Sequence, residues 1–563
     1  MAPFLQRFSS SPVSIIAVQK LTRKFYCGYP KDMGKNWAAF LPVCALCIVT
    51  VFGACSSPAN EETTTTSTPT AAPKEETASP KPEPTAVKES EPPEMSEQEP
   101  MEDNDEEYEV VFRFPNEWVS ADGLGEGILQ PLGDAALPEG FVEEEYLFAG
   151  EAVSYVPEGP VDTDGFWTVA EGSSAAYKTR MILRYPPPEQ FSGVVVVEWF
   201  NVTAGVDNSI DWSYLSEEIG RSGHAYVGVS AQYVGVMGRD TGRIPQGLID
   251  TRGLPIRDPD RYGDLVHPGD AYSFDIFSQA TVASLTILAS PDYGLPATSV
   301  VAAGQSQSAG YLTAYVNAVH PLVDIFDGFL IHGRGDGAPN PSVDDSLENV
   351  LIRSDVNVPV FIYETETDLT VLQYANARQE DAGNIRTWEV AGAAHADTYS
   401  ITYPRGFPRQ ASIGAALGCD GLINDGPQHE TLQAALHHFI TWVQEGVVPP
   451  AAPRIETTTE GEPVIVRDEM GIAIGGVRTP PVDAPLRILI GDPGSSEGFC
   501  FLFGQTFDID LETLQGMYPS LSAYVEALET AAGESVANGW LLPEDAEIMI
   551  EEETRRAEKA GLE

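Results

Sequence analysis

Residues 300–310 contain a serine whose surroundings suit a nucleophile. The segment reads Val-Val-Ala-Ala-Gly-Gln-Ser-Gln-Ser-Ala-Gly, so an apolar run of strand length stops at Gly304 and small residues follow Ser306. A strand that turns sharply into a helix holds one hydroxyl at the bend, as in a Gly-x-Ser-x-Gly nucleophile elbow. Ser308 takes the place of the second glycine and is itself an alternative nucleophile. Because the predicted strand ends directly before Gly304, we favour Ser306.

A serine hydroxyl is a weak nucleophile unless a base lies within hydrogen-bond reach. Downstream of Ser306, Asp368 follows the predicted strand 358–363 and His395 follows the predicted strand 386–390. Serine, acid, histidine is the order in which Gly-x-Ser-x-Gly hydrolases carry their catalytic triad. We expect His395 to take the proton of Ser306 and pass it to the leaving group, while Asp368 holds the imidazole in the correct tautomer.

Other residues compete for these roles. Glu364 and Glu366 precede Asp368 at even spacing, which would place all three carboxylates on one side only if the strand continued. We favour Asp368 and keep the two glutamates as alternative acids. His332, just beyond the predicted strand 326–331, is a further candidate for the lining of the site.

The oxyanion of an acyl-transfer reaction needs backbone N–H donors. The elbow itself would present the backbone amide of Gln307. A second amide is expected from the loop after the predicted strand 194–199, and Asn201 is the residue we favour there. Beyond the predicted export segment the sequence has no Cys-x-x-Cys pair, and it has no His-x-x-x-His, so neither a metal nor a cofactor is predicted.

The elements that must position these residues alternate between strands and helices. Nearly all-apolar strands separated by helices indicate a mostly parallel sheet with helices on both faces. Together with the elbow and the order serine, acid, histidine, this predicts the α/β-hydrolase fold class. Ligands of such sheets lie beyond the carboxyl ends of the strands. Residues up to 188 predict an antiparallel N-terminal β extension. The predicted strands are 194–199, 225–230, 299–303, 326–331, 358–363 and 386–390, and the predicted helices are 211–219, 274–288, 309–318 and 429–445.

The segment 232–270 interrupts this alternation and is expected to form part of the substrate wall. It carries five arginines in a very acidic protein. Two interpretations stay open: the arginines attract an anionic substrate, or they pair with nearby carboxylates. The five are Arg239, Arg243, Arg252, Arg257 and Arg261.

Length and charge limit the classes of function. The chain has 563 residues, 42% of them hydrophobic, and a formal net charge of -52. Such a surface repels nucleic acid, so a nucleic-acid partner is not expected. The composition divides the chain into an export segment (1–55), a disordered acidic tether rich in Pro and Thr (56–109), a catalytic domain (110–455) and a partly helical C-terminal appendage (456–563).

The N-terminal residues have the order of a secretory signal. Lysines precede the apolar stretch 37–54, and small residues lead into Cys55. This arrangement resembles a bacterial lipoprotein signal, in which Cys55 is lipidated and anchors the exported protein to the membrane, facing the exterior or periplasm. Whether Met1 or Met33 is the true start stays open.

Two cysteines remain outside this segment. Cys419 and Cys500 are expected to form a disulfide, because an exported protein matures in an oxidising compartment.

The chain resembles a poorly characterised family of bacterial exported α/β-hydrolase domain proteins over roughly residues 110–530. The Gly-x-Ser-Gln-Ser form of the elbow is characteristic of that family, so Ser308 is not a departure within it. The resemblance implies a hydrolase fold with a serine, a histidine and an acid, and it supplies no substrate. The segments that carry it are Val-Glu-Trp-Phe-Asn-Val at 197–202, Val-Ser-Ala-Gln-Tyr-Val-Gly-Val at 229–236, Tyr-Ser-Phe-Asp-Ile-Phe-Ser-Gln at 272–279, Gly-Gln-Ser-Gln-Ser-Ala at 304–309, Trp-Glu-Val-Ala-Gly-Ala-Ala-His-Ala-Asp at 388–397, Asn-Asp-Gly-Pro at 424–427 and Gly-Gly-Val-Arg-Thr-Pro at 475–480.

Together these features predict an exported serine hydrolase that cleaves a small-molecule carboxylic ester. A peptidase or amidase with the same triad is one alternative. A surface-binding lipoprotein without catalytic activity is another. The sequence does not indicate the substrate or the oligomeric state.

Overall fold

The computed structural model describes residues 113–128, 137–240, 249–343, 345–403, 409–458 and 461–563. The predicted export segment with Cys55 and the predicted acidic tether lie outside the described residues. Within the described residues, no helix is both long and apolar enough to cross a membrane.

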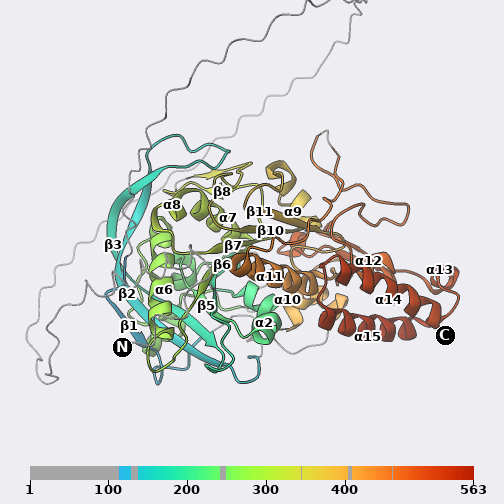
Figure 1. Cartoon of the computed structure of the whole chain (residues 1–563), viewed down its shortest axis with the longest axis horizontal. Coiled ribbons are helices and arrows are strands. Elements are labelled where there is room, and N and C mark those ends of the chain that lie inside the picture. The colour runs from blue at the N-terminus through green and yellow to red at the C-terminus, as the bar shows by residue number, and fades with distance from the viewer. Residues whose placement is uncertain (1–112, 129–136, 241–248, 344, 404–408, 459–460) are drawn as a thin grey trace, which may run out of the picture. The chain divides into compact units, whose positions relative to one another are not determined.

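A nine-stranded sheet forms the centre of the described chain, in the order β1-β2-β3-β5-β4-β6-β7-β10-β11. Strands β5, β4, β6, β7, β10 and β11 run parallel to one another, whereas the pairs β1–β2, β2–β3 and β3–β5 are antiparallel. Strands β6, β7 and β10 run side by side near the middle of Figure 1. The strand bounds are β1 Glu117–Ser120, β2 Val142–Pro157, β3 Val169–Tyr185, β4 Val194–Trp199, β5 Ala225–Val229, β6 Ser299–Gln305, β7 Gly328–His332, β10 Val360–Thr365 and β11 Ile385–Val390.

Helices cover both faces of the parallel strands. Every residue of β4 is buried, and its side chains alternate between two cores. Val195 and Val197 face the core that includes α6 (Ser273–Leu288) and α7 (Gln307–Ala314). Val194 and Val196 face the core that includes α2 (Ile210–Ser222) and α11 (Gln428–Glu445). The predicted α/β-hydrolase fold class is therefore confirmed, and the antiparallel hairpin of β2 and β3 is the predicted N-terminal extension.

The helices range from single turns to long helices. The α-helices are α2 Ile210–Ser222, α3 Tyr233–Met237, α4 Leu254–Arg257, α5 Pro259–Tyr262, α6 Ser273–Leu288, α7 Gln307–Ala314, α8 His320–Val323, α9 Glu366–Thr370, α10 Thr398–Thr402, α11 Gln428–Glu445, α12 Pro480–Asp483, α13 Leu511–Met517, α14 Leu521–Ala537 and α15 Pro543–Ala560. Two small sheets pair β8 (Ala338–Pro339) with β9 (Ser346–Leu347) and β12 (Arg487–Ile490) with β13 (Gln505–Asp508).

The C-terminal segment bonds directly to the central sheet. Val477 forms a parallel bridge with Val390 at the end of β11. Further along, α14 and α15 lie side by side, in red in Figure 1. The predicted boundary near residue 455 stays a prediction, but residues on either side of it share the core that contains β4 and α6.

Candidate active site

Ser306 occupies a strained turn between β6 and α7. Its φ and ψ are 63° and -120°, a conformation that side chains other than glycine rarely adopt. Such strain is characteristic of functional sites, where the surrounding structure holds it. The Ser306 N–H donates to the carbonyl of His332 at 2.8 Å, and the residue is partly exposed. The turn therefore leaves its side chain within reach of solvent at the carboxyl edge of the sheet.

Ser308 lies in a different environment. It is 0% exposed, and its Oγ has no hydrogen-bond partner in the described structure. A Cβ atom at Gly304 would lie only 3.3 Å from the Cβ of Ser308 and 2.9 Å from a methyl of Leu312. Ser308 thus packs against the strand, which leaves Ser306 as the accessible hydroxyl.

The acid and the histidine meet at the same edge. The Nδ1 atom of His395 donates to Oδ1 of Asp368 at 2.6 Å. The other oxygen of Asp368 accepts from the backbone N–H of Thr365 at 2.6 Å and from its hydroxyl at 2.7 Å. These bonds fix the carboxylate, and the carboxylate fixes which ring nitrogen of His395 carries the proton.

The two alternative acids lie elsewhere because β10 ends at Thr365 and α9 begins at Glu366. Glu364 is 0% exposed, has no hydrogen-bond partner in the described structure, and has a pKa that burial raises well above its usual range. Glu366 accepts from the backbone N–H of Gly392 and of Gly491. Neither glutamate bonds to His395 in the described structure.

The second ring nitrogen of His395 faces the elbow. Its Nε2 accepts from the side-chain amide of Gln305 at 3.1 Å. Gln305 is itself held by the side chain of Asn201, which donates to its backbone carbonyl at 3.0 Å. Sequence reasoning missed Gln305, although the residue directly precedes Ser306.

The predicted oxyanion donors differ in availability. Gln307 is the first residue of α7, where a backbone N–H has no carbonyl acceptor within the helix. The N–H of Asn201, in contrast, donates to the carbonyl of Asn208 at 3.0 Å. The predicted role of Asn201 is therefore corrected, because a short bridge in this loop already uses its amide. What Asn201 contributes is its side chain, through Gln305.

His332 contacts the elbow through its backbone carbonyl, and its ring does not line the site. The ring is fully buried, with Nδ1 donating to Asp211 at 2.8 Å and Nε2 accepting from Gln428 at 2.9 Å. Burial lowers the pKa of His332 to about 3. Its backbone carbonyl, which accepts from Ser306, is its contribution to the site.

The segment 232–270 begins against the elbow. Gln232 accepts from the side-chain amide of Gln307 at 3.0 Å. Two of its arginines pair with carboxylates: Arg252 with Asp250 and Arg261 with Glu145, each at 2.6 Å. Arg243 lies outside the described residues.

Cys419 and Cys500 are joined by a disulfide with an S–S distance of 2.03 Å. The bond links the loop after β11 to the C-terminal segment. In the part of the chain that the structure describes, no cluster of His, Cys, Asp and Glu side chains is arranged to hold a metal ion.

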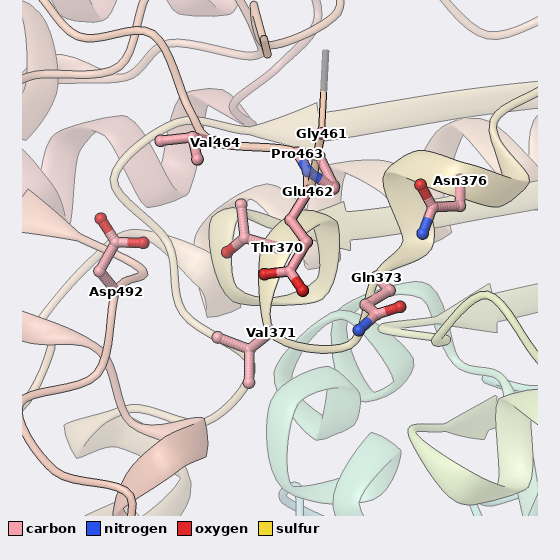
Figure 2. A pocket seen from close by; sticks show the side chains of 9 residues that line it. All are labelled: Thr370, Val371, Gln373, Asn376, Gly461, Glu462, Pro463, Val464 and Asp492. Carbon is pink, nitrogen blue, oxygen red and sulfur yellow. The ribbon is translucent and has the colours of Figure 1, made fainter. Parts of the chain in front are cut away.

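A pocket of about 400 Å³ opens beside α9. Figure 2 shows the carboxylate of Glu462 directed between Thr370 and Gln373, with Asp492 on the other side of Thr370. Neither Ser306 nor His395 lines this pocket. It is thus separate from the Ser306 turn, although α9 also carries Asp368.

The chain is similar to several solved structures at low sequence identity. Among solved structures, a glucuronoyl esterase from Teredinibacter turnerae is 13% identical, with 52% of this chain and 76% of that chain covered and a TM-score of 0.24. An α/β serine hydrolase homologue from Coxiella burnetii is 10% identical (51% and 91% covered, TM-score 0.23), and an esterase from Rhizomucor miehei is 11% identical (50% and 85% covered, TM-score 0.24). A search of curated proteins found no match.

The assignment of a family rests on the sequence itself. The profile of the family described as "Alpha/beta hydrolase domain" matches residues 111–551, which is most of the chain. The chain therefore belongs to the α/β-hydrolase domain family.

Proposed function

We propose that the protein is an exported serine hydrolase that cleaves a carboxylic ester through an acyl-enzyme on Ser306. The observation that carries the proposal is the position of His395. One ring nitrogen donates to Asp368, and the other faces Gln305, the residue next to Ser306. An imidazole held in this way is suited to remove a proton from a neighbouring hydroxyl.

The reaction has two steps. In the first, Oγ of Ser306 attacks the ester carbonyl carbon while Nε2 of His395 takes the hydroxyl proton. The C–O bond to the alcohol then breaks, and the alcohol leaves with that proton. In the second step, water attacks the acyl-enzyme, gives its proton to His395 and releases the acid, and the proton returns to Ser306. Nε2 of His395 has a single lone pair and cannot accept the serine proton while it accepts a hydrogen bond from Gln305. The bond from Gln305 must therefore break before the first step.

The oxyanion is proposed to bind to two backbone amides. The first is that of Gln307 at the start of α7. The second is that of Val202, which follows Asn201 and whose N–H has no acceptor among the described residues. Loss of one such donor typically costs about 100-fold or more in rate.

Export and lipid anchoring through Cys55 are part of the proposal, and their support is the order of residues at the N-terminus. A small-molecule ester is the proposed partner, reached from the exterior or periplasm. Mass spectrometry of the mature N-terminus tests this part. A lipid-modified Cys55 supports it, and an unprocessed N-terminus contradicts it.

A panel of p-nitrophenyl esters and peptide anilides tests the reaction. We expect hydrolysis of esters by the wild-type protein and none by Ser306→Ala. Turnover of anilides in place of esters would identify a peptidase or amidase. Absence of any turnover in the presence of a correctly folded protein would contradict a hydrolase.

A further inference from the structure

Glu366 joins three segments that are far apart in the sequence. Its carboxylate is fully buried and accepts from the N–H of Gly392 at 2.6 Å and from the N–H of Gly491 at 2.9 Å. Arg467 donates to the same carboxylate at 2.8 Å and to Asp492 at 2.9 Å. Burial raises the pKa of Glu366, and Arg467 with the two backbone N–H groups opposes that shift.

Gly392 belongs to the turn that carries His395. This turn, residues 391–395, follows β11 and places the imidazole at the carboxyl edge of the sheet. The C-terminal segment holds the turn at both ends: Ala391 donates to the carbonyl of Val477 at 3.0 Å, and Ala396 donates to the carbonyl of Leu502 at 2.9 Å. Between these contacts, the backbone N–H of Gly392 bonds to the side chain of Glu366 in α9, the helix that also carries Asp368.

The turn has no room to move toward its neighbours. Gly392 has a φ of 74°, and a Cβ atom there would lie 2.8 Å from a methyl of Val482. A Cβ atom at Gly504 would lie 2.8 Å from that of Ala394, the residue before His395. The side chain of Asn424 also donates to the carbonyl of Gly392, at 3.0 Å. The position of His395 therefore depends on contacts from residues 477–504.

The same carboxylate belongs to the helix that carries the acid. Glu366 is the first residue of α9, and Asp368 lies two residues further along that helix. Thr367, between them, donates from its hydroxyl to the carbonyl of Gly491 at 2.8 Å. The side chain of Glu366 thus connects α9, which carries Asp368, with the turn of His395 and with Gly491 of the C-terminal segment.

Glu364 offers a natural comparison. It is equally buried and lies on the same segment, but it has no hydrogen-bond partner in the described structure. Burial raises the pKa of Glu364 well above the usual range, which favours its neutral form, and glutamine has nearly the same size and shape.

We propose that Glu366 is a positioning residue that holds the turn of His395 at hydrogen-bond distance from Asp368, which makes the C-terminal segment part of the catalytic apparatus. This inference rests on the proposed function of Ser306, Asp368 and His395. The amide of Gln in place of the carboxylate cannot accept from Arg467, Gly392 and Gly491 at once, so the turn would shift.

The test compares Glu366→Gln with Glu364→Gln in the full-length protein, using the rate at which a fluorophosphonate probe labels Ser306. Misplacement of a catalytic group by about 1 Å costs on the order of 100-fold in rate. We therefore expect a fall of roughly 10- to 100-fold for Glu366→Gln and little change for Glu364→Gln. Equal labelling by wild type and Glu366→Gln would overturn the proposal.

A second readout follows the geometry itself. With ¹⁵N-labelled histidine, the proton on Nδ1 of His395 gives a low-field NMR resonance as long as it bonds to Asp368. We expect Glu366→Gln to shift or abolish this resonance and Glu364→Gln to leave it in place. An unchanged resonance in Glu366→Gln overturns the proposal, even if labelling falls.

Arg467→Met provides the variant for the case in which Glu366→Gln does not fold. It keeps the carboxylate and both backbone bonds but removes the arginine, so we expect a smaller fall in labelling with a shifted resonance. Wild-type behaviour in both readouts overturns the proposal. If wild type fails to react with the probe, the proposed function falls, whereas the resonance still reports on the positioning by Glu366.

Discussion

The Nδ1 atom of His395 lies 2.6 Å from Oδ1 of Asp368, although the two residues are 27 positions apart in the chain. Both side chains are almost completely shielded from water, with His395 3% and Asp368 0% exposed. A charge-assisted hydrogen bond in so dry a place is strong and directional. It orients the imidazole so that Nε2 faces the turn of Ser306.

Replacing Asp368 with asparagine should abolish most of the activity. The amide favours the wrong imidazole tautomer, and a fall of about 10,000-fold in kcat is expected with the fold intact. Ester hydrolysis and circular dichroism of Asp368→Asn measure the two effects. Retention of activity in Asp368→Asn, or its loss in the control Glu364→Gln, would contradict the assignment of the acid.

A side chain at Gly333 should disturb the hydrogen bond between His395 and Asp368. A Cβ atom there would lie 3.2 Å from Nδ1 of His395 and 3.5 Å from Oδ1 of Asp368. Gly383 has nearly the same backbone conformation, with φ of 56° against 59°, but nothing lies within 4 Å of its Cβ position.

Alanine at either glycine costs about 1–2 kcal/mol of backbone strain, so Gly333→Ala should lose at least as much stability as Gly383→Ala in thermal unfolding. Only Gly333→Ala should also lose ester hydrolysis. Equal activity of the two variants would show that the contact with His395 and Asp368 does not matter.

Much of the fold followed from patterns in the sequence. The run Val194–Trp199 is apolar except for Glu198, and a strand with apolar residues on both faces must be buried on both sides, as β4 is. The elements predicted around it differ from the observed ones by a few residues at their ends. Those ends depend on local turns, which hydrophobic periodicity does not specify.

Fewer features of the site than of the fold could be predicted from the sequence. The choice between Glu364, Glu366 and Asp368 depends on where β10 stops, and Thr365 stops it by bonding to Asp368. The bond of Gln305 to His395 crosses 90 positions and has no local signal. The amide of Asn201 was misassigned because its bridge to Asn208 depends on how the loop folds back on itself.

Reduction of the disulfide between Cys419 and Cys500 should destabilise the protein. The bond closes a loop across 81 positions, and removal of such a constraint costs about 3–5 kcal/mol through the entropy of the unfolded chain. Urea unfolding with and without a reductant measures the change. The double variant Cys419→Ser/Cys500→Ser should be insensitive to the reductant, and an unchanged wild-type midpoint would contradict the prediction.

Stability should fall at alkaline pH through His429. Burial acts to lower its pKa, but Glu430 and Glu217 outweigh burial and raise the pKa to about 9. A histidine with a raised pKa in the folded state contributes stability that is complete below about pH 6.5 and is lost as the pH rises through about 9.

Melting temperatures between pH 6 and 10 should therefore decline for wild type. The decline should be weaker in His429→Gln, which cannot carry the charge. Parallel curves for the two proteins would exclude His429 as the cause.

The central claim is that Ser306 is the nucleophile, and the most direct test is to locate the adduct formed with a fluorophosphonate probe by peptide mass spectrometry. The account predicts one equivalent of probe on Ser306, no labelling of Ser306→Ala and undiminished labelling of Ser308→Ala. An adduct on Ser308 or on any other residue, or no adduct on a folded wild-type protein, would contradict it.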